Sequence, residues 1–324
     1  MRRLLKLMIS VALVVLAFHL LDVRTILDTT KGGSASSFAI AVILNILAFF
    51  VMGLRWHLLI APGVPRTFLA HMGVYLKGTF LNTFTPANLG GDAYRLAVLR
   101  KKVKSSGVLV KLLLRERILG LYGYVIVFAL AYMWVLPSLG SSVRLTSNPY
   151  TYGAILALGV LILPFVAEPL GRQIVKLVRH KVGTTRIPKL ESWAETGASL
   201  FSPKGVLPLM LLTILGVVLW IASIKIIGDG FAVSIPLTHL AAVATLVEII
   251  RLVPLTIQGI GLREGVFAYL LNFLGHSPEQ CYVVGAVSYL ALSLAIILCG
   301  PLGQAVMWLG RAGTNAVGSE ERIE

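Results

Sequence analysis

Two pairs of oppositely charged residues share one spacing inside apolar surroundings. Asp92 lies three residues before Arg95, and Glu248 lies three residues before Arg251. In a helix this spacing brings the two side chains onto one face, about one turn apart. A guanidinium binds phosphate oxygens well, and a neighbouring carboxylate can hold it when no phosphate is bound. A carboxylate in an apolar site can also act as a general base, so headgroup binding and group transfer are both open chemistries.

Each pair also has a structural interpretation. Asp92 could cap the start of a helix while Arg95 begins a basic face, and Glu248 with Arg251 could form a structural ion pair. An unpaired charge at the centre of a membrane helix costs about 2.5–3.5 kcal/mol on insertion scales, so such charges are rare and usually functional. We therefore predict that both pairs line a headgroup path.

The charged pairs border two breaks in otherwise apolar regions. The first break contains Asn82, Pro86, Asn88, Gly90 and Gly91, and the second contains Pro254, Gln258, Gly259 and Gly261. Glycine allows a ligand to approach the backbone closely, and a helix that starts after a break offers free N–H groups to an anion. The amide side chains could bind headgroup oxygens or satisfy carbonyls that the broken helices leave free.

Further charges lie beside the breaks. Arg263 and Glu264 follow the second break, and because adjacent helical side chains point about 100° apart, we expect them to have different partners. Glu116 and Arg117 open the third long apolar run, where Glu116 could pair with an arginine of a break. A pairing of Asp92 with Arg263 is an alternative. The predicted headgroup-binding residues are Asn82, Pro86, Asn88, Gly90, Gly91, Asp92, Arg95, Glu116, Arg117, Glu248, Arg251, Pro254, Gln258, Gly259, Gly261, Arg263 and Glu264.

The elements that position these residues follow from the composition. Hydrophobic residues make up 57% of the chain and charged residues only 13%, against about 25% charged residues in soluble domains. The first long apolar run ends at residue 21. Further runs cover 38–61, 118–136, 150–169, 206–227 and 280–309. Arg55 and Trp56 near the end of the second run are interpreted as an interface anchor. These patterns predict an all-α polytopic membrane protein with about six full spans.

The two broken regions, 67–98 and 236–274, are too interrupted for clean spans. Broken backbone at membrane depth must be satisfied by protein or by a wet cavity, so we interpret both regions as re-entrant hairpins. Each half of the chain then runs span, span, hairpin, span, and the prolines of the two breaks are 168 residues apart. Paired broken segments in two halves of opposite topology point to a transport site at the membrane midplane.

Charge and domain organisation agree with this arrangement. The net charge of +15 arises from basic residues next to apolar segments, which places both termini in the cytoplasm by the positive-inside rule and gives no reason to expect nucleic-acid binding. We expect one transmembrane domain over 1–313, with inverted half-repeats at about 1–140 and 141–310. A flexible tail, 314–324, follows. Metal-binding and nucleotide-binding motifs are missing, so we expect no cofactor.

Four motifs occur in a characteristic order. They are Arg55-Trp56-x-Leu-Leu, Pro86-x3-Gly90-Gly91-Asp92-x2-Arg95, Glu116-Arg117-x2-Gly120, and Pro254 followed by Gly259-x-Gly261-x-Arg263-Glu264. Together they resemble, over nearly the whole chain, the flippase-like transmembrane domain of lysylphosphatidylglycerol synthetases and its stand-alone relatives. The resemblance implies a bacterial or archaeal cell membrane and movement of lipids or lipid-linked sugars between leaflets. A short tail stands here where the two-domain synthetases carry an aminoacyltransferase, so aminoacyl transfer is not expected.

The leading hypothesis is a lipid translocase without catalytic residues. It would move an anionic phospholipid or lipid-linked sugar through a cleft where the two hairpins meet. Two alternatives stay open: a membrane partner of a separate lipid synthase or glycosyltransferase, and an enzyme that transfers a group to or from a polyprenyl phosphate or phospholipid. The missing nucleotide motif disfavours ATP as the energy source.

Overall fold

The computed structural model describes residues 19, 21–62, 64, 67–83, 85, 89–100, 106–135, 173, 203–251 and 259–320. Within these residues the chain is helical and has no strand, as predicted. The helices are α2 (Val23–Lys31), α3 (Ala35–Ile60), α4 (Phe68–Asn82), α5 (Gly90–Leu99), α6 (Ser106–Val135), α9 (Pro203–Gly230), α10 (Leu237–Ile250), α11 (Leu262–Asn272) and α12 (Pro278–Glu320).

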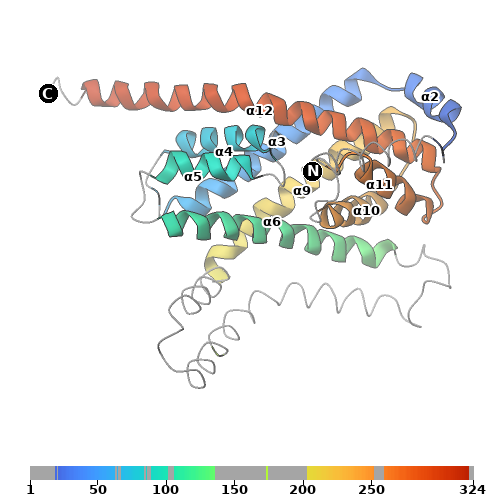
Figure 1. Cartoon of the computed structure of the whole chain (residues 1–324), viewed down its shortest axis with the longest axis horizontal. Coiled ribbons are helices and arrows are strands. Elements are labelled where there is room, and N and C mark those ends of the chain that lie inside the picture. The colour runs from blue at the N-terminus through green and yellow to red at the C-terminus, as the bar shows by residue number, and fades with distance from the viewer. Residues whose placement is uncertain are drawn as a thin grey trace, which may run out of the picture.

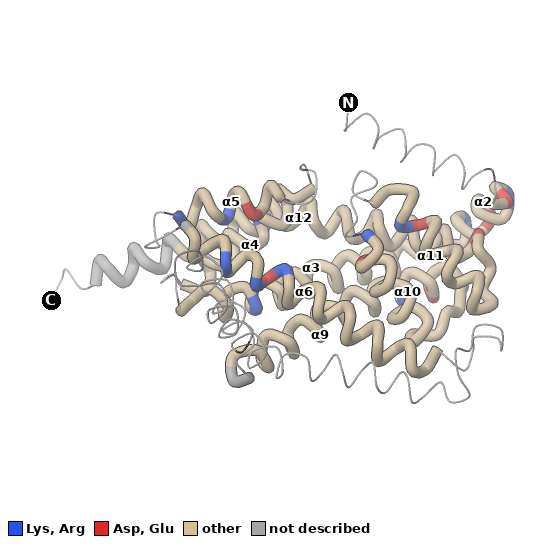
Figure 2. The backbone as a smooth tube through the Cα atoms, turned by 60° about the horizontal axis from the view of Figure 1, so that its bottom comes forward, with Lys and Arg blue, Asp and Glu red and all other residues tan. Residues whose placement is uncertain are grey.

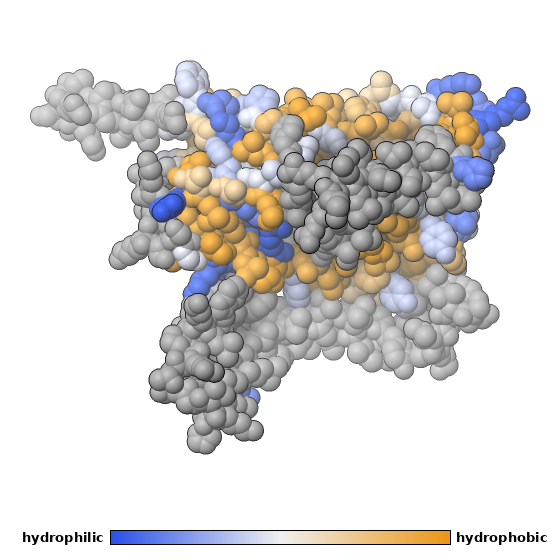
Figure 3. Space-filling view, in the orientation of Figure 1, coloured by the Kyte–Doolittle hydropathy of each residue, from blue (hydrophilic) through white to orange (hydrophobic). Residues whose placement is uncertain are grey.

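Within the described residues, four helices are long and apolar enough to cross a membrane. They are α3, α6, α9 and the part of α12 up to Gly310, with 26 to 33 residues each. At 1.5 Å per residue even the shortest exceeds the roughly 30 Å of a hydrocarbon core. Much of the visible surface between the two ends of the molecule is hydrophobic (Figure 3). The other two predicted spans, the run ending at residue 21 and 150–169, lie outside the described residues.

One predicted boundary is wrong. α6 begins at Ser106, so Glu116 and Arg117 lie within the helix and do not open it. The helix can continue through these charges because they are paired with residues of neighbouring helices, as described below. The apolar part of α12, Pro278–Gly310, agrees with the predicted run 280–309, and the helix itself continues past Pro301 to Glu320.

The regions predicted as hairpins each form two short helices. The first pair is α4 and α5, and the second pair is α10 and α11; all four helices are shorter than the spans. Their packing is reciprocal, since α4 packs along α12 while α10 packs along α6, and α3 packs against α9 (Figure 1). The first helix of each pair therefore packs against the long helix that follows the other pair in the sequence.

Close packing fixes the first pair against α12. A side chain built at Gly303 of α12 would come within 3.0 Å of the carbonyl oxygen of Gly73 in α4, so the two backbones lie close together. Small residues allow this approach between membrane helices, where dispersion contacts have to replace the hydrophobic effect.

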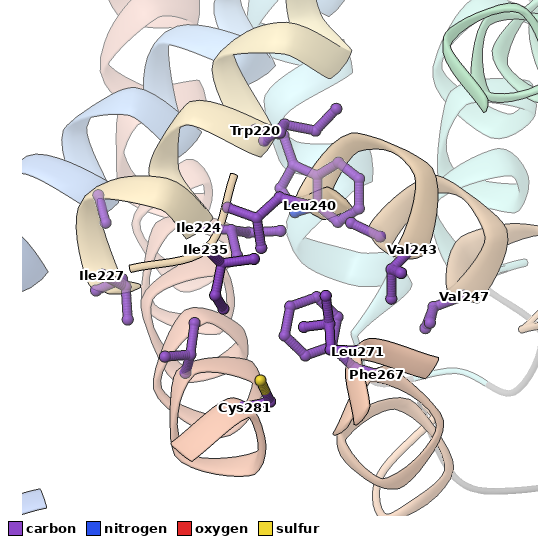
Figure 4. Close-up of a cluster of buried hydrophobic side chains, with 14 of the residues drawn as sticks. Trp220, Ile224, Ile227, Ile235, Leu240, Val243, Val247, Phe267, Leu271 and Cys281 are labelled. Carbon is purple, nitrogen blue, oxygen red and sulfur yellow. The ribbon is translucent and has the colours of Figure 1, made fainter. Parts of the chain in front are cut away.

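The second pair is held by a core of apolar side chains. Residues from α9, α10, α11 and α12, including Trp220, Leu240, Phe267 and Leu271, point toward one another there (Figure 4). A separate apolar cluster around Trp56, Met72 and Leu76 packs α3, α4 and α6 together. These two clusters set the positions of the charged residues that follow.

Candidate functional site

The first charge cluster is centred on Glu116 of α6. Its carboxylate accepts a hydrogen bond from Arg95 of α5 at 2.7 Å and lies 3.7 Å from Arg55 of α3. Arg55 also donates to the hydroxyl of Thr213 in α9 at 2.9 Å. The three charged side chains are less than 10% exposed. One buried carboxylate thus joins two guanidinium groups from different helices, as predicted for Glu116 and an arginine of the break.

Two aromatic rings enclose the guanidinium of Arg95. Its central carbon lies 4.6 Å from the ring centre of Tyr75 in α4 and 4.9 Å from that of Trp56 in α3. Such cation–π contacts strengthen when the cation is removed from water. The prediction that Arg55 and Trp56 anchor the chain at the membrane interface is wrong: Arg55 is 4% exposed and Trp56 fully buried, because both pack against this cluster.

Asp92 extends the first cluster toward the surface. One of its oxygens accepts two hydrogen bonds from the guanidinium of Arg117, at 2.6 and 2.8 Å, and the other lies 3.8 Å from Arg95. Asp92 does not cap α5, whose N-cap position is held by Leu89 without a side-chain bond. The predicted proximity of Asp92 and Arg95 is therefore confirmed, and Arg117, whose side chain is 46% exposed, joins them.

The break between α4 and α5 positions this cluster. The backbone N–H of Gly91 donates to the side-chain oxygen of Asn82 at 2.7 Å, and that of Gly90 donates to the hydroxyl of Thr85 at 2.7 Å. Asn82 therefore satisfies the backbone, one of its two predicted roles. A side chain at Gly91 would lie 2.1 Å from the carbonyl oxygen of Gly78, so only glycine fits. Pro86 and Asn88 lie outside the described residues.

The second charge cluster is centred on Glu248 of α10. Arg251 donates to it from two nitrogens, at 3.0 and 2.5 Å, and Arg263 of α11 lies 3.4 Å from its other oxygen. The guanidinium of Arg263 lies 5.0 Å from the ring centre of Tyr289 and 5.8 Å from that of Trp220. As in the first cluster, a carboxylate joins two arginines and two aromatic rings flank the arginine that follows the break.

Glycines and a carboxylate shape the start of α11. Gly259 and Gly261 have φ angles of +84° and +78°, which glycine adopts without strain. Glu264 accepts a hydrogen bond from the backbone N–H of Gly261 at 2.8 Å, so its carboxylate caps the helix. Arg263 and Glu264 therefore have different partners, as predicted. Pro254 and Gln258 lie outside the described residues.

The clusters occupy separate places along the molecule (Figure 2). Asp92 and Arg263 are engaged within their own clusters and do not form the pair considered as an alternative. Tyr124 of α6 packs against the apolar core around the second helix pair. Its ring contacts Trp220 edge-on at 6.0 Å between centres.

Sequence reasoning missed the aromatic part of the site. The rings that flank the two arginines belong to Trp56, Tyr75, Trp220 and Tyr289. A signal was present, because each broken region is preceded by a span that carries a tryptophan. Arg95 and Arg263 are also 168 residues apart, the spacing of the two breaking prolines.

The arrangement suits recognition of anions by guanidinium groups. The first cluster brings three arginines to two carboxylates, and the second brings Arg251 and Arg263 to Glu248. Each set of named groups therefore carries one positive charge in excess. Among the described residues no group of three or more His, Cys, Asp or Glu side chains could hold a metal ion.

No curated protein matches the chain. The family model described as the lysylphosphatidylglycerol synthase TM region matches residues 3–300, more than nine tenths of the 324 residues. With four apolar helices in the described part of the chain that could cross a membrane, the match identifies a multi-pass membrane domain with a role in lipid metabolism or transport. The chain belongs to the lysylphosphatidylglycerol synthase transmembrane family.

Proposed function

We propose that this protein moves phospholipids or lipid-linked sugars between the leaflets of a bacterial or archaeal cell membrane. One observation carries the proposal: a buried cluster of arginines, carboxylate and aromatic rings stands beside each of the two broken helix pairs. A charged cluster is expensive inside a membrane domain unless it serves a function, and broken helices in two halves are typical of transport sites.

The chemistry of the clusters supports headgroup passage. A phosphate loses its water when it enters an apolar protein, and a guanidinium with fixed N–H groups replaces that water. Glu116 and Glu248 neutralise Arg95 and Arg263 between passages, so the arginines are not left unpaired when the site is empty. The acyl chains would stay in the bilayer, against the apolar outer faces of α3 and α9.

Reciprocal packing supports an inverted repeat. α4 packs along α12 and α10 along α6, which is the pattern expected if two similar halves exchange their hairpins around an axis between α3 and α9. We propose that both helix pairs are re-entrant, that both termini are cytoplasmic, and that one half rocks against the other during transport. The headgroup would pass from one cluster to the other along α6 and α9, past Tyr124.

The test is lipid movement in sealed proteoliposomes. Fluorescent phosphatidylglycerol is reconstituted with the protein, and a membrane-impermeant reductant reports which label reaches the outer leaflet. Asp92→Asn and Arg263→Ala should each lower the rate about tenfold or more, which corresponds to losing one charged contact in the moving state. Asp28→Asn, which removes the exposed ion pair with Lys31 in α2, is the control and should leave the rate unchanged.

Other outcomes point to the other hypotheses. If folded Asp92→Asn and Arg263→Ala proteins both move lipid at the rate of the unaltered protein, the site assignment is wrong. A chemically altered lipid formed in detergent, without a sealed vesicle, would favour a group-transfer enzyme. Stable co-purification with a synthase or glycosyltransferase, together with no lipid movement, would favour a partner role.

A further inference from the structure

A narrow pocket opens beside the second cluster, between α9, α10, α11 and α12. Its walls include Trp220, Val247, Phe267 and Gly285, and Arg263 and Ser288 also line it. The pocket has a volume of about 10 Å³, which is roughly what one water molecule requires. A single oxygen atom fits into this space, but a whole lipid headgroup does not.

Two donors in the pocket have no partner among the described residues. They are Nη1 of Arg263 and the hydroxyl oxygen of Ser288, and both side chains are more than nine-tenths buried. A buried polar group without a hydrogen bond costs about 1–3 kcal/mol, and most buried polar groups in native proteins are paired. A single acceptor atom in the pocket would satisfy both groups.

Arg263 is held less tightly than Arg95. Its nearest carboxylate oxygen, on Glu248, lies at 3.4 Å and accepts no hydrogen bond from the described residues, whereas Arg95 bonds Glu116 at 2.7 Å. Glu248 directs its other oxygen to Arg251. One carboxylate therefore faces two guanidinium groups, and the excess of one positive charge matches the single negative charge of a phosphodiester.

We propose that this pocket is an oxyanion subsite that receives one non-bridging phosphate oxygen of a lipid phosphodiester. Arg263 donates to that oxygen from Nη1, and Ser288 donates its hydroxyl hydrogen. Trp220 and Phe267 form apolar walls around that oxygen, and the rest of the lipid stays outside the pocket. The assignment rests on the proposed transport function and deepens it, because it names the phosphodiester as the recognised group.

The decisive variant is Ser288→Ala. The affinity for a soluble short-chain phosphatidylglycerol, measured by titration calorimetry in detergent, should fall about tenfold, the loss of a hydrogen bond to a charged group. The thermal midpoint of the empty protein should stay the same or rise, because the variant removes a buried hydroxyl without a partner. A hydroxyl that merely supports the fold would give the opposite result, with a lower midpoint and unchanged affinity.

A matched control removes another buried hydroxyl nearby. Thr245 of α10 is fully buried, and its hydroxyl donates to the backbone of its own helix at 2.6 Å. Thr245→Val should leave lipid affinity unchanged. Unchanged affinity in Ser288→Ala, or a loss of affinity as large in Thr245→Val, would overturn the proposal.

Two further ligands show whether the oxygen bound in the pocket belongs to a lipid phosphate or to free inorganic phosphate. Short-chain diacylglycerol, which lacks the phosphate, should not bind competitively, and inorganic phosphate should compete only weakly because it lacks the apolar part. Competition by inorganic phosphate as strong as that by the lipid would assign the pocket to free anions and overturn the lipid assignment. The translocation assay tests the transport function separately from the subsite. If the unaltered protein moves no lipid but Ser288→Ala weakens lipid binding, the transport function is wrong and the subsite assignment is supported.

Discussion

The two clusters differ in where the carboxylate comes from. Arg95 of α5 pairs with Glu116 of α6, a helix outside its own pair, whereas Arg263 of α11 pairs with Glu248 of α10, the other helix of its pair. Glu116 therefore ties α5 to α6 and, through Arg55, to α3. Glu248 ties α10 to α11 alone. The first cluster cross-links three helices of the molecule, while the second stabilises one helix pair from within.

This difference suggests a division of roles. The first cluster is closed, with Arg95 enclosed by Glu116 at 2.7 Å and by the rings of Trp56 and Tyr75. The second is looser, because Arg263 lies 3.4 Å from its carboxylate and lines a pocket, whereas the unpaired Nε of Arg95 belongs to an enclosed guanidinium. We expect changes in the closed part of the first cluster, at Arg55, Arg95 and Glu116, to act mainly on stability. Changes in the second cluster should act mainly on lipid binding and movement.

The largest effect on stability is expected for Glu116→Gln. The variant leaves Arg55 and Arg95 buried without their shared counter-ion, which typically costs about 3–5 kcal/mol. Thermal unfolding in detergent should show a strongly lowered midpoint, while Asp28→Asn on the exposed surface should behave like the unaltered protein. An unfolding midpoint for Glu116→Gln equal to that of the control would contradict the claim that Glu116 is the buried counter-ion of Arg55 and Arg95.

A smaller but still large effect is expected for Gly91→Ala. The added methyl group would lie 2.1 Å from the backbone oxygen of Gly78, so α4 and α5 must separate, at an overpacking cost of about 1–3 kcal/mol. Gly265→Ala in α11 is the matched control, because no atom lies within 4 Å of its added methyl group. Unfolding midpoints that fall equally for both variants would show that close packing is not specific to the first helix pair.

Lysine substitutions test whether the first cluster serves stability and the second serves lipid movement. Arg95→Lys and Arg263→Lys both keep the charge but lose the planar fork of donors. Arg95→Lys should lower the unfolding midpoint more, and Arg263→Lys should lower the rate of lipid movement more, by about tenfold. Stability and transport measured on the same preparations give the comparison, and equal effects on both quantities would remove the proposed division of roles.

The smallest expected effect is on the pH dependence of stability and concerns two pairs of histidines, one beside each helix pair. His57 and His71 meet at 2.8 Å beside α4, and His239 and His276 meet at 3.0 Å where α10 approaches the turn before α12. Burial lowers the pKa of His276 below its ordinary value of 6.5, which favours the neutral imidazole.

The sign of the pH dependence follows from that shift. Because the unfolded chain takes up the proton first, the stability present above about pH 6.5 is lost as the pH falls toward the lowered pKa of folded His276. His276→Gln should flatten the dependence of the unfolding midpoint between pH 7 and 5. A slope unchanged by the substitution would assign it to other groups.

Much of the site was predictable because apolar segments make charges conspicuous. The pairs Asp92 with Arg95 and Glu248 with Arg251 follow from a three-residue spacing, which is a property of the local helix. The different partners of Arg263 and Glu264 follow from helix geometry as well. The role of Trp56 was misjudged, because a tryptophan next to an arginine near the end of a span is also typical of the membrane interface.

The sequence by itself determined that the chain is an all-α membrane protein and where its helices break, because apolar length and the backbone limits of proline and glycine act locally. Only the tertiary structure decided which charges meet. Glu116 binds Arg95 and Arg55 because α3, α5 and α6 converge, and Arg263 faces Ser288 because α11 packs on α12. Contacts between distant segments depend on how helices pack, and neither spacing nor hydropathy encodes that packing.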